Sequence, residues 1–137
     1  MGLIFYNQGD YAHAETTYRE ALAIARKLRG DGHRDVATQL SGLGLVLREQ
    51  GNLPEAEAAL REALAIYRKL YGGDAHPFIG VVFNNLALVL RSQGKFDEAE
   101  GLFIQSLELT KKMVGTENRD VAITLHNLAS LAHRNTG

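Results

Sequence analysis

The stretch that decides the fold is residues 84–103, NNLALVLRSQGKFDEAEGLF. Its apolar residues recur with gaps of three and four, the spacing of one face of a helix. Gln93-Gly94 interrupts this pattern halfway along. Glycine accepts the left-handed backbone conformation that ends many helices, so Gly94 predicts a turn between two antiparallel helices.

The interruption recurs along the chain. Gly9, Gly51 and Gly94 each follow a glutamine, and they are 42 and 43 residues apart. The segments after the three turns are related: DYAHAETTYREAL, NLPEAEAALREAL and KFDEAEGLFIQSL. A second related segment occurs as DVATQLSGLGLVLREQG, FIGVVFNNLALVLRSQG and DVAITLHNLASLAHRNTG. The chain is therefore an array of helix pairs, and such internal repetition predicts a solenoid.

The repeats define the predicted organisation. We expect an all-α fold, because no segment alternates with period two for long enough to predict a strand. The 137 residues are expected to form a single domain, with partial repeats at 1–32 and 118–137 and full repeats at 33–75 and 76–117. Short polar residues near the starts of the second helices are expected to cap free N–H groups: Asp10, Asn52 and Asp97.

Composition excludes several classes of protein. With 15 basic and 16 acidic residues, the chain lacks the basic excess of nucleic-acid and anionic-membrane binders. The absence of cysteine excludes disulfides and thiolate metal sites. No apolar run is long enough for a membrane span, and no secretory signal is visible, so we expect a cytoplasmic location.

The repeated residues resemble the tetratricopeptide repeat. The resemblance is carried by Leu86-Ala87, Gln93-Gly94, Phe96, Ala99-Glu100, Phe103 and Ser106, and by Leu43-Gly44, Gln50-Gly51, Leu53, Ala56-Glu57, Leu60 and Ala63. The long period, the NNLA segment and the junction GGDAHPFIG are similar to the repeats of kinesin light chains. The resemblance implies a right-handed α-solenoid of antiparallel helix pairs, a superhelix whose concave groove commonly holds an extended peptide.

The resemblance also implies where a peptide would bind. The asparagine before the Leu-Ala pair often hydrogen-bonds the peptide backbone in this family, and the matching residues are Asn85 and Asn127. The first copy has Gly42 there, so the row of amides is incomplete. The predicted groove also includes Thr38, Leu45, Asn84, Leu88, Arg91, His126, Ser130 and Arg134. The alternative is that the asparagines are solvated surface amides or support a packing contact.

Nothing in the sequence predicts catalysis, a cofactor or a metal. The positions at which one family subset grips a terminal carboxylate with Lys and Arg hold Thr38, Val81 and Ile123, so no such clamp is expected. His126 and His133 share a helix face but have no neighbouring carboxylate or thiolate, which makes a poor metal site. His33 and His76 begin first helices after a turn, where we expect a structural role in bonding backbone across the junction.

The ends of the array carry apolar residues where a solenoid needs a polar cap. These are Leu3 and Phe5 at one end and Leu125, Leu128 and Leu131 at the other. We expect either a fragment of a longer array or ends that stack or swap between copies.

The leading prediction is a non-catalytic module that binds a peptide or protein segment, with no nucleic-acid or membrane partner. Self-association through the terminal helices is the first alternative. The second is a sensor or scaffold part of a larger multidomain signalling protein.

Overall fold

The computed structural model describes residues 2–114 and 119–136, with the side chains of residues 5–7, 113, 114, 119–122 and 132–136 excepted. The elements in these ranges are helices: α1 (Gly2–Asn7), α2 (Tyr11–Arg29), α3 (Arg34–Glu49), α4 (Leu53–Tyr71), α5 (Pro77–Ser92), α6 (Phe96–Val114) and α7 (Arg119–Thr136). No strand occurs among them. The predicted all-α fold of helix pairs is confirmed.

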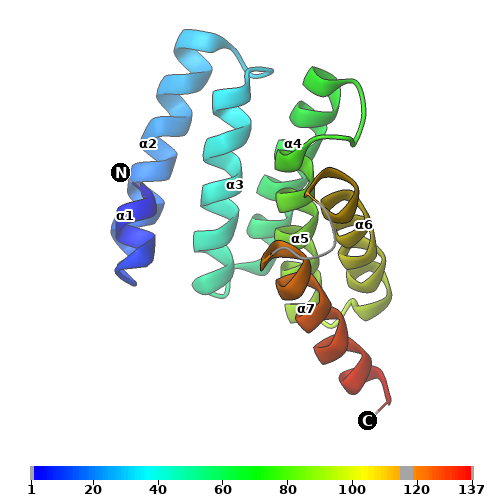
Figure 1. Ribbon diagram of the computed structural model, residues 1–137. Coiled ribbons are helices and arrows are strands. Elements are labelled where there is room, and N and C mark those ends of the chain that lie inside the picture. The colour runs from blue at the N-terminus through cyan, green and yellow to red at the C-terminus, as the bar shows by residue number, and fades with distance from the viewer. Residues whose placement is uncertain (1, 115–118, 137) are drawn as a thin grey trace. The chain divides into compact units, whose positions relative to one another are not determined.

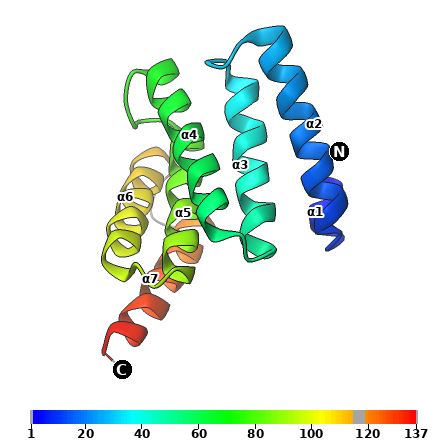
Figure 2. The same cartoon turned by 180° about the vertical axis from the view of Figure 1, so that it is seen from behind.

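The helices form two compact units, residues 1–72 and 73–137. In the first unit α3 packs against both α2 and α4, and α1 packs on α2 (Figure 1). In the second unit α6 packs against both α5 and α7 (Figure 2). None of the described helices is long and apolar enough to cross a membrane.

The three predicted Gln-Gly turns are confirmed. Gly9, Gly51 and Gly94 have φ values of 77°, 82° and 80°, in the region that a residue with a Cβ rarely adopts. Each turn ends one helix and lets the next run back beside it. The period of the sequence therefore comes from a backbone requirement that recurs once per helix pair.

Asp10 caps its helix as expected, Asn52 does not, and the capping role of Asp97 stays a prediction. Asp10 accepts a hydrogen bond from the His13 backbone N–H at 3.2 Å, which caps α2 as predicted. Asn52 precedes α4 but its side chain makes no capping hydrogen bond, because its Nδ2 donates instead to Glu55 at 2.7 Å. The capping prediction for Asn52 is therefore wrong.

His33 and His76 bond the backbone as predicted, but not across the junction. Each precedes a first helix, and its Nδ1 accepts from a backbone N–H two residues on: Asp35 at 3.0 Å and Phe78 at 3.2 Å. These bonds occupy N–H groups that a helix start leaves without partners. Each histidine thus bonds the first turn of its own helix.

The core is built from small residues that face large ones. Ala56, Ala63 and Ala87 are fully buried, as are Leu60 and Phe103. A Cβ placed on Gly44 of α3 would come within 2.7 Å of the Leu60 side chain of α4, so these two helices approach as closely as glycine permits. The predicted close packing of helix pairs is confirmed in the described core.

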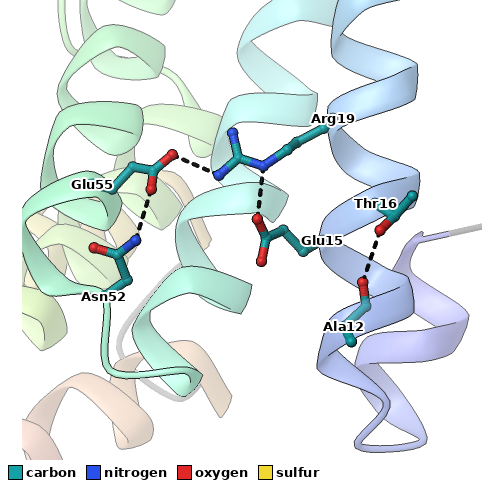
Figure 3. Close-up of polar contacts among 6 residues, drawn as sticks. All are labelled: Ala12, Glu15, Thr16, Arg19, Asn52 and Glu55. Carbon is teal, nitrogen blue, oxygen red and sulfur yellow. Dashed lines mark hydrogen bonds and ion pairs between the residues drawn. The ribbon is translucent and has the colours of Figure 1, made fainter.

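Ion pairs join the second helices of the first unit. Arg19 of α2 bonds Glu15 at 2.8 Å and also reaches Glu55 of α4 at 2.6 Å (Figure 3). Seven residues further along α2, Arg26 bonds Glu62 of α4 at 2.7 Å. The hydrogen bond from Arg19 lowers the pKa of Glu55, and the same bond raises the pKa of Arg19.

Candidate functional site

In the second unit, α5 and α7 are each the first helix of a repeat, and they bring three asparagines together. Asn84 and Asn85 lie on α5 and Asn127 on α7, and we call them the amide row. The Asn127 Nδ2 donates to Asn84 Oδ1 in a long bond of 3.4 Å, which places α5 and α7 side by side here. Asn85 and Asn127 are each only 8% exposed, so they are not the solvated surface amides of the alternative prediction.

The Asn85 amide is the unusual member of the row. It makes no hydrogen bond to any other residue that the structure describes, although the residue is almost buried. Its atoms are also absent from the polar side-chain atoms of the described residues that are both cut off from solvent and without a hydrogen-bond partner, which are Ser41 Oγ, Arg48 Nε and Gln93 Oε1. Because an amide donates and accepts at once, Asn85 can bond a backbone carbonyl and a backbone N–H of an incoming segment.

The first unit lacks an amide at the equivalent position for a steric reason. A Cβ on Gly42 of α3 would overlap the ring of Tyr18, which reaches across from α2. The residues equivalent to Tyr18 in the next two copies are Leu60 and Phe103, and the residues equivalent to Gly42 are Asn85 and Asn127. The amide row therefore belongs to the second unit.

Uncharged side chains lie along the Asn85 face of α5 and beside Asn127 on α7. On α5, Phe78 and Val81 are 43% and 54% exposed, Leu88 is half-buried and Ser92 is exposed. Phe78, Val81, Asn85, Leu88 and Ser92 have gaps of three and four, which puts them on one face of the helix. On α7, Ile123 is 42% exposed and Ser130 half-buried. The face can bind an extended segment through amides and apolar contacts.

The other predicted groove residues occupy varied places. Thr38 is exposed, and its Oγ1 lies 3.2 Å from the Tyr67 hydroxyl of α4. Burial raises the pKa of Tyr67. Leu45 and Arg91 are half-buried, and His126 is exposed. The side chain of Arg134 lies outside the described residues.

The predicted self-association residues differ in how far their side chains are exposed. Leu3 and Leu125 are 57% and 48% exposed, and Leu128 is half-buried. Leu131 is 1% exposed and belongs to the core of its unit. The side chain of Phe5 lies outside the described residues.

Neither a surface hollow of the second unit nor a metal site adds chemistry to this face. A shallow hollow of about 280 Å³ is lined by Phe83 and Leu109 together with polar and charged side chains of both signs, among them Asp74, Glu108 and Lys112. Among the residues that the structure describes, no group of three His, Cys, Asp or Glu side chains could hold a metal ion.

The comparison with known families agrees with the helix pairs. The family model described as tetratricopeptide repeat matches residues 1–69 and 78–135. The chain belongs to the tetratricopeptide-repeat family. Repeats of this family generally mediate protein–protein interaction.

Solved structures with the same repeat architecture are long. BtubC (BKLC) from P. vanneervenii is similar at 28% identity and a TM-score of 0.83, over 98% of this chain and 52% of that one. A putative kinesin light chain from Podosopora anserina, with nearly identical TPR-like repeats, has 21% identity and a TM-score of 0.88, over 98% and 64%. The tetratricopeptide chain described here therefore spans about half to two thirds of the length of these relatives. No curated protein matches it.

Proposed function

We propose that this tetratricopeptide protein is a non-catalytic interaction module whose second unit binds an extended segment of a partner protein across α5 and α7. The observation that carries the proposal is the nearly buried Asn85 amide, which has no hydrogen-bond partner among the described residues. Because the polar atoms of this amide are not cut off from solvent, a bound peptide backbone would take the place of water at Asn85. Asn127 would offer a second bonding position along the same segment.

The side chains beside the amides indicate the chemistry of the bound segment. Val81 and Ile123 occupy equivalent places on α5 and α7, and both are exposed. A branched apolar residue cannot grip a carboxylate, but it can pack against apolar side chains of a peptide. The proposed ligand is therefore an internal, uncharged segment with apolar residues, rather than a free carboxyl terminus or an acidic stretch.

Selection from a random peptide library on the immobilised protein tests this proposal. Peptides that bind are then titrated against the wild type, Asn85→Ala and Asn127→Ala by fluorescence anisotropy. We expect each substitution to weaken binding by roughly tenfold, since it removes a bonding amide from a desolvated site. Gln105→Ala is the matched control, because it removes an exposed amide from α6. Unchanged affinity in both asparagine variants, or failure to select any binding peptide, would contradict the proposal.

The chemical class of the ligand has its own test. Selected peptides should be apolar, and their affinity should change little between low and high salt, because no charged pair is involved. Val81→Lys combined with Ile123→Lys should abolish that binding and introduce affinity for acidic peptides. Selection of acidic peptides by the wild type would leave the module intact but contradict the ligand class.

A larger assembly is the second candidate function. The chain spans 52% and 64% of the two relatives, and we propose as the alternative a sensor or scaffold part of a larger multidomain protein. In that case the same face would bind a segment of another subunit or of the same protein, and the asparagine variants would have the same effect.

A further inference from the structure

The ring of Tyr18 lies between two glycines of the first unit. One edge of the ring faces Gly42 on α3, where an added Cβ would overlap Cε1 and Cζ. The other edge faces Gly2 on α1, where an added Cβ would lie 2.8 Å from Cε2 and 2.9 Å from Cζ. Both contacts involve the far end of the ring, so the carbon that carries the hydroxyl lies between α1 and α3. Tyr18 therefore reaches from a second helix, α2, in between two first helices.

Gly42 lies on a face of α3 that a partner can reach. Thr38, Gly42 and Leu45 have gaps of four and three, which puts them on one side of the helix. Thr38 is exposed and Leu45 is half-buried. Position 42 is also equivalent to two positions of the amide row in the second unit. The end of the Tyr18 ring thus occupies the place that an amide side chain would take in the first unit.

The two units place a polar group at this position from different helices. In the second unit the residue equivalent to Tyr18 is Phe103, which has no hydroxyl and is fully buried. The polar group there is the amide of Asn127, on the first helix that follows. In the first unit that following helix has Gly42, and the polar group is the hydroxyl of Tyr18 on α2. Each unit therefore has one hydrogen-bonding side chain at this position.

The neighbouring hydroxyls on this face of α3 are already bonded to each other. The Thr38 Oγ1 donates to the Arg34 carbonyl at 3.1 Å, so it accepts from the Tyr67 hydroxyl of α4, which lies 3.2 Å away. Tyr67 itself is only 3% exposed. Thr38 therefore offers its methyl group to a segment lying over α3, and Leu45 offers an apolar side chain. The polar contact between these two apolar contacts would have to come from Tyr18.

We propose that Tyr18 is a partner-binding residue of the first unit, whose hydroxyl replaces the missing amide and bonds the backbone of an extended, uncharged segment lying over α3. The inference rests on the proposed function, in that the protein binds such a segment. A hydroxyl donates one hydrogen bond and accepts two, so a bond within the protein leaves it able to bond a partner as well. An amide can bond two backbone groups at once, so Tyr18 should contribute less to affinity than an asparagine of the amide row.

Peptides of about 20 residues, selected on the wild type from a random library, span roughly 70 Å when extended and can reach beyond the amide row. Each is titrated by fluorescence anisotropy against the wild type and Tyr18→Phe, which removes the hydroxyl and keeps the ring. We expect binding to weaken roughly threefold to tenfold, the loss of one neutral hydrogen bond. Thr16→Val is the matched control, because it removes an exposed hydroxyl from α2 about 200° around the helix from Tyr18. Its affinity should equal that of the wild type.

Tyr18→Leu combined with Gly42→Asn gives a second test, because it moves the polar group from α2 to α3. The combination copies the next repeat, which has Leu60 and Asn85 at these positions. Tyr18→Leu alone should weaken binding at least as much as Tyr18→Phe. The double variant should recover most of that affinity, since the amide restores a hydrogen-bonding group at the same place. Circular dichroism checks that each variant is folded.

The outcomes separate this inference from the proposed function. If Asn85→Ala and Asn127→Ala weaken binding and Tyr18→Phe does so for none of the peptides, the role of Tyr18 is overturned and the proposed function stands. If Tyr18→Phe weakens binding and the asparagine variants do not, the proposed function fails and the role of Tyr18 stands. A loss in Tyr18→Leu without one in Tyr18→Phe would show that only the packing of the ring matters, which also overturns the inference. Failure to select any peptide would contradict both.

Discussion

The ring of Tyr18 on α2 lies so close to Gly42 on α3 that one added methyl group at Gly42 would overlap it. This contact decides where the amide row begins, since Gly42 occupies the place that asparagine occupies in the second unit. It also fixes the spacing of α2 and α3. The same steric contact therefore excludes an amide at position 42 and sets how closely α2 and α3 pack.

Gly42→Ala should lower the free energy of unfolding by about 1–2 kcal/mol. Overpacking costs about 1–3 kcal/mol, and the better helix propensity of alanine returns up to about 1 kcal/mol. Tyr18→Leu in the same protein should restore stability, because leucine stands at the equivalent position 60. Urea unfolding measures both. Gly101→Ala is the control: its Cβ would meet nothing within 4 Å, so it should stabilise by about 0.5–1 kcal/mol.

Ala63→Leu should destabilise the protein by about 1–3 kcal/mol through overpacking, because Ala63 is fully buried on α4. Ala65→Leu places the same side chain on the exposed side of that helix and should change stability little. Thermal unfolding of the two variants side by side checks this. Equal melting temperatures would show that the close packing of α3 and α4 has been assigned wrongly.

His76→Ala should cost about 1 kcal/mol, the usual loss when a helix cap is removed. The lost bond is the one from the Phe78 N–H to the imidazole at 3.2 Å. His76→Asp should recover most of that stability, because a carboxylate accepts from the same N–H group. Recovery separates capping from ring packing on Phe78, whose centroid lies 4.9 Å from that of His76. An aspartate variant as unstable as the alanine variant would favour ring packing.

Stability should fall in acid partly through Glu55. Its pKa is lowered in the folded protein by the bond from Arg19, so its contribution is complete above its ordinary value of 4.5 and is lost as pH falls below it. Because the pair is exposed to solvent, the contribution should be less than about 1 kcal/mol. Glu55→Gln should flatten this part of the pH dependence. A variant that loses stability in acid as steeply as the wild type would refute the role of Glu55.

The fold could be read almost entirely from the repeated glycine turns and the helical spacing of apolar residues. These signals are local, so the turns at Gly9, Gly51 and Gly94 lie where the sequence predicts them. The Asn52 cap could not be predicted, because Glu55 competes for its amide. Backbone position alone does not decide which partner a short polar side chain takes.

The candidate site was predicted in part. The asparagine positions followed from the repeat, but their burial did not, because burial depends on how α5 and α7 pack. Leu131 shows the same limit, since an apolar residue in a terminal helix can face the core or solvent. The Tyr18–Gly42 contact did leave a signal in the sequence. Tyr18 is larger than its equivalents Leu60 and Phe103, and the helix that follows it has Gly42 where later copies have asparagine.

The most direct test of the interaction module is an NMR titration that follows the side-chain NH₂ resonances of the asparagines as a selected peptide is added. The proposal predicts that the resonances of Asn85 and Asn127 shift most, in a saturable way, while those of Asn52, which precedes α4 in the first unit, stay unchanged. Shifts confined to residues of α2, α4 or α6, with Asn85 and Asn127 unmoved by a peptide that binds, would contradict it.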